Sequence, residues 1–388
     1  MLLKSIEYSE YSGTNQEWIL EHLPLGTRNL LVGKNATGKT RCLNLIGGLS
    51  KLLSGEWQPS GFVTGNFKVI FEDGQDVLEY VLEIHEKCVT REVLVINGKT
   101  MLARGADGAG EILAEKINQG IMIEFQSPQD ELAAFVRRDS RQHSFLERLY
   151  LWGHSTRHYH FGTSLGKENF ALLVKKNSTL PDGKNPGEII GVFLRAKRDF
   201  PDLFERGVLR DMDRVGYPID SINVGPLVSV RYEIALVNEV VAIRVQEKNQ
   251  KGLTDQAGMS QGMFRVLSIL ILINYMECKQ QSACLVIDDL GEGLDFERSC
   301  LLIDLLREKT EKSKIQLIIS SNDKFVMNEV PIVEWSFLQR SGGTVRVRNV
   351  ENSRELFEEF RFTGLSNFSF LEMDFANGLP AEEPAAHE

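Results

Sequence analysis

Apolar and polar residues alternate from Phe62 to about Leu102, which is the pattern of strands buried on one face. Three strands are expected within the first 40 residues, and a helix follows them. An antiparallel meander comes next, with strands at 67–71, 77–84 and 89–96 and a turn signal at Asn97-Gly98. The N-terminal part of the chain is therefore predicted to carry an antiparallel β insert.

The pattern is less regular in the middle of the chain. A short helix is expected over 111–119, strands over 121–125 and 132–138, and a helix over 144–152, where the apolar residues have helical spacing. Most prolines and glycines of this part fall within 163–226. Their number predicts a subdomain of short helices and loops, set apart from the sheet.

The second half of the chain has the pattern of a parallel α/β core. Strand alternation returns over 228–245, and an apolar helix is expected over about 262–276. Two continuous apolar runs, 284–287 and 315–319, flank a helix predicted at 296–307. Such runs are typical of parallel strands that are covered on both faces. We therefore predict an α/β fold with a mixed sheet.

The same patterns divide the chain into five expected parts. They are a first lobe with the antiparallel β subdomain (1–142), a helical insert (143–227), the second half of the core (228–340), a C-terminal helical extension (341–379) and a disordered tail (380–388). The extension rests on an amphipathic pattern at 355–360, and the tail on its prolines and glutamates.

Composition narrows the class of protein. The chain has 388 residues, 42% of them hydrophobic and 25% charged, as in an ordinary globular protein. Its net charge of −10 disfavours tight binding of nucleic acid, which usually needs a basic face. No apolar run approaches a membrane span, no signal peptide is recognisable, and the five cysteines lack C-x-x-C spacing. A cytoplasmic protein with reduced thiols is expected.

A complete phosphate-binding loop, Gly-Lys-Asn-Ala-Thr-Gly-Lys-Thr, occupies residues 33–40 between a predicted strand and a predicted helix. Its glycines let backbone N–H groups surround phosphate oxygens, Lys39 reaches the β- and γ-phosphates, and the Thr40 hydroxyl can bind Mg²⁺. The helix N-terminus that follows adds a favourable dipole. The residues expected to bind a nucleoside triphosphate are Gly33, Lys34, Asn35, Ala36, Thr37, Gly38, Lys39, Thr40 and Arg41.

Two adjacent acids, Asp288 and Asp289, end the buried run 284–287. A carboxylate at the end of such a strand is where a P-loop protein holds Mg²⁺, and Asp288 has this position. Asp289 is then expected to polarise the attacking water. The great separation of this pair from the P-loop predicts a family with long inserts between its nucleotide motifs.

Three further segments resemble motifs of the ABC-type ATPases. Met259-Ser260-Gln261-Gly262 precedes the apolar helix as their signature loop does, 293–295 reads Gly-Leu-Asp like their D-loop, and Asn322 stands where their switch histidine is found. The antiparallel meander makes the chain similar to the SMC, RecF and OLD branch rather than to transporters. The resemblance covers most of residues 1–340.

The resemblance implies a composite site between two heads. ATP would lie between the P-loop of one head and Ser260, Gln261 and Gly262 of the other. Mg²⁺ would be held by Thr40, Asp288 and a glutamine, for which we favour Gln142, with Gln126 and Gln129 as alternatives. Lys39, Asp289, Glu292 and Asn322 would be the catalytic residues.

Departures from the family pattern predict slow turnover. Asp289 replaces the usual glutamate and is one methylene shorter, and Glu292 could supply the longer carboxylate. Asn322 can bond a γ-phosphate but cannot carry a proton. These changes affect hydrolysis more than ATP binding.

The sequence also limits the biological roles that such an ATPase could have. The sequence has no heptad pattern for a coiled-coil arm and no C-x-x-C for a zinc hook. Because only about 60 residues follow Asn322, we expect no nuclease domain in this chain. The resemblance implies an ATP-dependent dimer that regulates a separately encoded effector, with a nuclease as one candidate, as in ATPases of bacterial anti-phage systems. The alternative is a RecF-like DNA clamp, and a P-loop kinase is less consistent with the signature-like loop.

Overall fold

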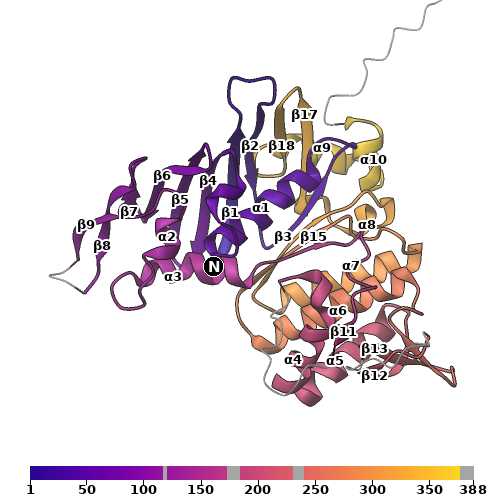
Figure 1. The fold of residues 1–388 in the computed structure, drawn as a ribbon. Coiled ribbons are helices and arrows are strands. Elements are labelled where there is room, and N and C mark those ends of the chain that lie inside the picture. Colours follow the sequence, from indigo (N-terminus) through magenta and orange to yellow (C-terminus); the bar gives the residue numbers. More distant parts are fainter. Residues whose placement is uncertain (117–119, 173–183, 230–239, 376–388) are drawn as a thin grey trace, which may run out of the picture.

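A computed structural model describes residues 1–116, 120–172, 184–229 and 240–375 (Figure 1). Within them, one fourteen-stranded mixed sheet joins the two halves of the chain. Its strands, in spatial order, are β10 (Arg157–His160), β15 (Ala283–Asp288), β16 (Ile315–Ser320), β3 (Arg28–Val32), β17 (Trp335–Ser341), β18 (Thr344–Arg348), β2 (Trp18–Pro24), β1 (Leu2–Glu10), β4 (Thr64–Asp73), β5 (Asp76–His85), β6 (Cys88–Ile96), β7 (Lys99–Arg104), β8 (Ala109–Ala114) and β9 (Ile121–Gln126).

The parallel strands β10, β15, β16, β3 and β17 form the centre of the fold. Every residue of β15 and β16 is buried, as their continuous apolar runs predicted. Cys284, Val286 and Ile318 face the core beneath α1 (Lys39–Leu53) and α3 (Ser144–Ser155). Leu285 and Ile287 face a second core that contains α6 (Gln261–Lys279) and α7 (Phe296–Glu311). The two faces of the sheet are therefore covered by different helices.

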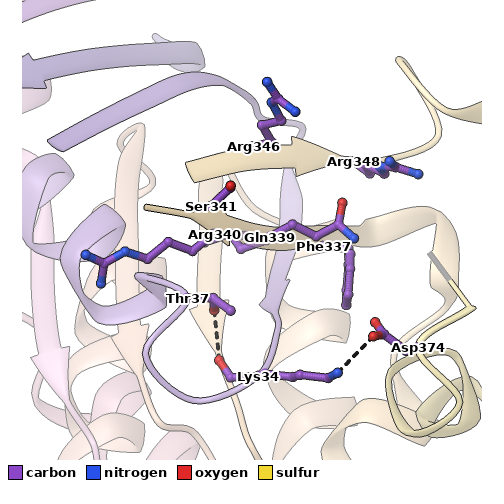
Figure 2. A pocket seen from close by; sticks show the side chains of 10 residues that line it. Lys34, Thr37, Phe337, Gln339, Arg340, Ser341, Arg346, Arg348 and Asp374 are labelled. Atoms are coloured by element: carbon purple, nitrogen blue, oxygen red, sulfur yellow. Dashed lines mark hydrogen bonds and ion pairs between the residues drawn. The ribbon is translucent and has the colours of Figure 1, made fainter. Parts of the chain in front are cut away.

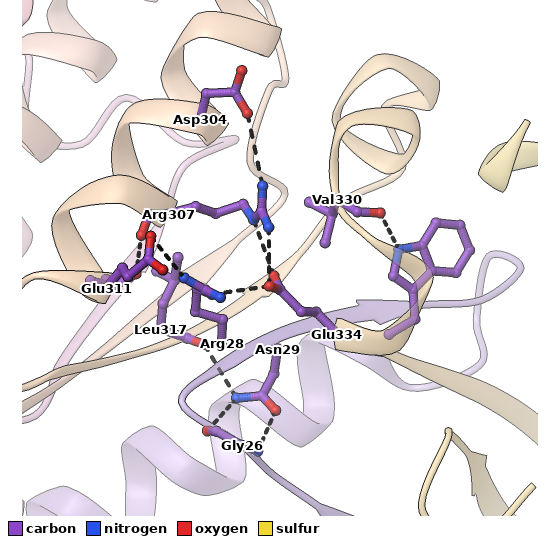
Figure 3. Close-up of polar contacts among 11 residues, drawn as sticks. Gly26, Arg28, Asn29, Asp304, Arg307, Glu311, Leu317, Val330 and Glu334 are labelled. Carbon is purple, nitrogen blue, oxygen red and sulfur yellow. Dashed lines mark hydrogen bonds and ion pairs between the residues drawn. The ribbon is translucent and has the colours of Figure 1, made fainter. Parts of the chain in front are cut away.

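The P-loop strand β3 is anchored at the end away from the loop (Figure 3). Arg28 Nε donates to Glu334 Oε1 (3.0 Å), and Arg307 on α7 donates to both oxygens of the same carboxylate (3.1 Å each). Asn29 Nδ2 donates to the carbonyls of Gly26 (2.9 Å) and Leu317 (3.3 Å). These bonds fix β3 against β16 and against the short 3₁₀ helix η3 (Ile332–Glu334).

The antiparallel strands β4 to β9 form an arm that extends from the core (Figure 1). The predicted meander and the strand at 121–125 are confirmed. The helix predicted over 111–119 is wrong in its described part, because Ile112, Leu113 and Ala114 are buried in strand β8 between β7 and β9; residues 117–119 lie outside the described residues.

The strand predicted over 132–138 is also wrong, since Ala133–Val136 forms the short helix α2. A buried side chain from another strand explains the difference. Glu92 on β6 accepts hydrogen bonds from the backbone N–H groups of Ala133 (2.7 Å) and Ala134 (2.8 Å). A carboxylate at the first free N–H groups of a helix stabilises that helix start.

Glu92 is the centre of a buried polar cluster. Tyr80 donates its hydroxyl to Glu92 Oε1 (2.9 Å), and Arg104 Nη1 lies 3.7 Å from Oε2. Arg104 also donates to the carbonyls of Glu131 (2.6 Å) and Pro128 (2.7 Å). Burial raises the pKa of Glu92 even though its hydrogen bonds and Arg104 oppose that shift. The cluster therefore fixes residues 128–134 to the arm.

Replacement of Glu92 by alanine is expected to lower the free energy of unfolding by about 3–5 kcal/mol, because it leaves Arg104 buried without its carboxylate. Glu83→Ala is the matched control, since Glu83 pairs with Arg91 on the exposed side of the same meander. Its loss is expected to lower the free energy of unfolding by only about 0–1 kcal/mol. Urea unfolding followed by circular dichroism measures both. Equal losses in the two variants would contradict this role of Glu92.

A helical lobe lies on the other side of the core (Figure 1). It contains α4 (Ile189–Asp199), α5 (Pro201–Arg214), α6 and α7. Short helices and loops were expected over 163–226, but two strands of this range belong to a small sheet completed by residues further along the chain. Its strands are β11 (Ala171–Leu172), β13 (Val240–Glu247), β12 (Ile219–Pro226) and β14 (Leu253–Asp255). Of the alternation predicted over 228–245, residues 240–245 belong to β13, while 230–239 lie outside the described residues.

Helices α5, α6 and α7 share a buried ionic cluster. Lys309 Nζ lies 2.7 Å from Asp211 Oδ2, and Asn274 Nδ2 donates to the same oxygen (2.9 Å). Lys309 also pairs with Glu277. Each buried charge thus has a partner, and the signature helix α6 is held between its neighbours.

The C-terminal part packs on the sheet. The hairpin of β17 and β18 crosses the domain boundary that the sequence predicted at residue 341. Helix α8 (Lys324–Glu329) follows β16, and α9 (Arg354–Phe362) and α10 (Asn367–Glu372) end the described chain. Phe357 and Phe360 each pack against Phe370, which in turn packs against Phe337. The helix predicted at 355–360 is confirmed; the tail 380–388 lies outside the described residues.

Two short 3₁₀ helices, η1 (Pro59–Gly61) and η2 (Pro186–Glu188), complete the described elements. None of the helices in the described ranges has both the length and the apolar character that crossing a bilayer requires.

Candidate functional site

The P-loop connects β3 to α1 and has the backbone shape that its glycines allow. Gly38, directly before α1, has φ +106°, a left-handed value that favours glycine. A Cβ on Gly33 would lie 2.7 Å from the carbonyl oxygen of Leu338, so only glycine fits between the loop and β17. The loop is therefore closed tightly against the sheet.

Lys39 lies across this loop. Its Nζ donates to the carbonyls of Gly33 (2.7 Å) and Lys34 (3.3 Å), and the residue is only 6% exposed. Burial lowers the pKa of Lys39, while Asp289 and Asp288 oppose this shift. The ammonium group thus lies between the loop and the paired acids, where phosphate oxygens would be bound.

Asp288 ends β15 in contact with three hydrogen-bond donors. Ser320 at the end of β16 donates its hydroxyl to Oδ1, and His160 Nδ1 at the end of β10 lies 3.4 Å from Oδ2. Burial favours the neutral acid, but hydrogen bonds from His160, Ser320 and Thr40 outweigh it and lower the pKa of Asp288. An ionised carboxylate beside the Thr40 hydroxyl is the result.

Asp289 begins the turn after β15 and has φ +55°, which is strained for a residue with a side chain. Its N–H donates to Ser320 Oγ (3.0 Å), and Asn322 Nδ2 donates to its Oδ1 (3.3 Å). Burial raises the pKa of Asp289, and the charges of Asp288 and Glu292 raise it further. A raised pKa in this position favours a role in proton transfer.

Glu292 lies close to the same point. Its carboxylate packs against Gly162, where an added Cβ would also lie 3.6 Å from Asp289 Cβ. Glu292 and Asp289 therefore reach the same strand end from one turn. The structure brings together Lys39, Thr40, Asp288, Asp289, Glu292 and Asn322 at the carboxyl edge of the parallel strands, as the order of the motifs predicted.

The signature-like loop lies at the start of α6. Ser260 is the N-cap and its Oγ accepts from the N–H of Met263 (3.2 Å). A Cβ on Gly262 would be 3.0 Å from Leu294 and 3.1 Å from the carbonyl of Gly293, so the loop packs on the Gly-Leu-Asp segment. Gln261 Nε2 donates to the carbonyl of Thr163 (3.3 Å). The contacts of these three residues are thus made within α6, with the Gly-Leu-Asp segment and with the segment after β10.

The predicted glutamine ligand lies elsewhere. Gln142 precedes α3, its N–H donates to Asp139 Oδ1 (2.9 Å), and its carbonyl accepts from Glu115 (3.1 Å) next to β8. Gln126 and Gln129 bond the carbonyls of Asp107 (2.7 Å) and Ala106 (2.9 Å) in the arm. All three glutamines therefore contact the arm.

His160 is the side chain that sequence reasoning missed. It ends β10, the strand next to β15, and reaches Asp288. The signal was weak, because β10 has only four residues, too few for a recognisable alternation. The glycine at 162, two residues further on, is the one local hint of a turn at a strand end.

A cavity of about 310 Å³ lies on the outer side of the P-loop (Figure 2). Lys34 points into it and pairs with Asp374 (2.9 Å), while Thr37 Oγ1 donates back to the carbonyl of Lys34 (2.9 Å). Arg340, Arg346 and Arg348 of the β17–β18 hairpin also line it. The Lys34 side chain is thus directed into the outer cavity, while its carbonyl accepts a hydrogen bond from Lys39.

The chain is similar to known proteins in its structure but not in its sequence. No family model matches the chain, and a search of curated proteins finds no match either. Among solved structures, an SMC head bound to the C-terminal winged-helix domain of ScpA is similar with a TM-score of 0.52 and 12% identity, covering 90% of this chain and 97% of that one. An SMC head with an extended coiled coil, bound to the C-terminal domain of ScpA from Pyrococcus furiosus, has the same TM-score and identity, covering 93% and 99%.

The chain has the fold of an SMC head domain. The expectation of an ABC-type ATPase fold is thereby confirmed at the level of architecture. In this SMC-head fold the P-loop, the paired acids and Asn322 follow β3, β15 and β16, which are neighbours in the sheet. The edge strand β10 adds His160 to the same row of strand ends.

Proposed function

We propose that this protein is an ABC-type ATPase head that binds ATP with Mg²⁺ and hydrolyses it slowly. The observation that carries the proposal is the joint placement of Thr40, Asp288 and Lys39 at one edge of the sheet. Thr40 bonds an ionised Asp288, and Lys39 is held over the loop that cradles phosphates. This arrangement of a buried ammonium group, a hydroxyl and an ionised carboxylate suits the binding of a phosphate group with its metal ion.

The donor set fits Mg²⁺. Among the described residues no group of three or more histidine, cysteine or acidic side chains could form a metal site by itself. Mg²⁺ in a nucleotide site does not need one, because it takes one or two protein oxygens and completes its shell with phosphates and water. Thr40 and Asp288 would supply the protein oxygens, and we assign to His160 the place beside them for which the sequence suggested Gln142.

Asp289 is the proposed general base for the attacking water. Its raised pKa brings proton acceptance closer to neutral pH, and Asn322 orients its carboxylate. Turnover is expected to be slow because the aspartate is short and Asn322 cannot carry a proton. Glu292 is the alternative base, since it reaches the same strand end.

The function of the head is proposed to be ATP-dependent association. Ser260 and the N–H groups at the start of α6 would bind the γ-phosphate held by a second copy, since a helix N-terminus favours an anion. The dimer would regulate a separately encoded effector, with a nuclease of an anti-phage system as our candidate. The similar SMC heads were solved with a domain of ScpA bound, which is a precedent for a partner protein.

The proposal is tested by sizing the purified chain. With ATP and Mg²⁺ the mass measured by light scattering is expected to double, whereas Ser260→Arg is expected to bind ATP and stay monomeric. An unchanged mass of the native chain at saturating ATP would contradict the dimer. A parallel measurement with duplex DNA distinguishes this dimer from the RecF-like alternative. A DNA clamp would form a complex with the DNA, and the affinity of that complex would fall steeply with salt.

A further inference from the structure

Arg265 joins three parts of the site that lie far apart in the sequence. It is in the second turn of α6, five residues after Ser260, and is 8% exposed. Its Nε donates to the carbonyl of Thr163 (2.9 Å) and its Nη2 to that of Gly162 (2.7 Å). Its Nη1 donates to the carbonyl of Glu292 (2.6 Å). One guanidinium thus bonds the segment after β10 and the turn after β15.

The arrangement depends on the shape of arginine. The guanidinium is planar and presents its donors in a fixed fork, so bonds to three carbonyls determine the relative position of the two segments. Lysine has a single charged nitrogen and cannot reproduce this geometry. Gly293 confirms how closely the segments approach, because a Cβ there would lie 2.7 Å from Arg265 Nη1.

The two segments carry the proposed hydrolytic groups. The first begins directly after His160, which reaches Asp288. The second contains Asp289 and Glu292, and the Glu292 carboxylate packs against Gly162 of the first. Any change in the distance between the segments would therefore move Asp289 and Glu292 relative to His160.

We propose that Arg265 is a positioning residue that sets the geometry of the hydrolytic acids from the signature helix. The inference rests on the proposed function, since it assigns to Arg265 a role in ATP turnover. It acts through the backbone carbonyls of Gly162 and Glu292, to which it donates. Arg265 and Ser260 both lie at the start of α6. The helix that would bind the γ-phosphate of ATP on a second copy therefore also positions Asp289 and Glu292 of its own chain.

The test compares Arg265→Met and Arg265→Lys with the native chain. We expect kcat to fall about tenfold to a hundredfold in both variants, as for a displacement of about 1 Å at a reacting centre, with the Kd for ATP unchanged within about twofold. Arg206→Met is the matched control, because Arg206 on α5 is exposed and donates to the carbonyl of Asp202 (3.1 Å). Added methylguanidinium is expected to restore part of the kcat of Arg265→Ala.

A purely structural role gives a different result. In that case Tm and ATP affinity fall together with kcat, and methylguanidinium restores nothing. Native kcat in Arg265→Met would also overturn the inference.

Hydrogen exchange of the full chain makes the test independent of turnover. Arg265→Met is expected to speed exchange in 161–164 and 289–293 and to leave the P-loop helix α1 unchanged. If the native chain has no ATPase activity, the proposed function fails, and the exchange result still decides the role of Arg265. Unchanged exchange in both segments would overturn it.

Discussion

Replacing Lys39 by alanine is expected to weaken ATP binding at least roughly thirtyfold and to reduce turnover and ATP-dependent association with it. The ammonium group is buried beside the loop carbonyls and opposite Asp288 and Asp289, so its loss removes a buried positive charge from the proposed phosphate site. Truncating one partner of a buried charge pair costs at least about 2 kcal/mol, or roughly thirtyfold in Kd. Titration calorimetry with ATP and Mg²⁺ measures the loss.

The same loop offers a matched control. Lys34→Ala removes a lysine whose side chain points into the outer cavity and pairs with Asp374. The Kd for ATP is expected to change by less than about threefold, since an exposed ion pair contributes at most about 1 kcal/mol. A loss of equal size in the two variants would show that Lys39 has no special role at the phosphates.

The second large effect is expected from Asp289→Asn. This variant should bind ATP like the native chain but hydrolyse it at least about a hundredfold more slowly, because general-base catalysis contributes about 10² to 10⁴. The ATP-bound dimer should therefore accumulate. Phosphate release and light scattering on the same sample measure both results.

The pH dependence of the native chain has a defined direction. Only the ionised carboxylate accepts a proton, and burial with Asp288 and Glu292 raises the pKa of Asp289. Turnover should therefore fall with decreasing pH at a higher pH than an ordinary aspartate would give. If Glu292→Gln stops hydrolysis while Asp289→Asn does not, the base is Glu292.

Local patterns made much of the core predictable. The P-loop, the buried strands β15 and β16 and the helices α6 and α7 each depend on a short stretch of sequence, so a motif or a periodicity is enough to find them. Asp288, Asp289 and Asn322 then follow, because they occupy the ends of strands that become neighbours.

The parts that could not be predicted depend on distant partners. Helix α2 starts where Glu92 from another strand meets the N–H groups of Ala133 and Ala134. His160 reaches Asp288 only because β10 pairs with β15, and Arg265 bonds Gly162 across 103 positions. No window of sequence contains both members of these pairs.

The continuous sheet also has a mechanical consequence. Hydrogen-bonded strands resist shear within the plane of a sheet, and the arm and the P-loop strand β3 belong to one such sheet. The outer edge strand β9 exposes Ile121 and Met122. A load applied at that edge would reach the P-loop only through the paired strands, and the shortest pairing on that route is the one between β18 and β2, where Thr344 and Val345 face Ile19 and Leu20.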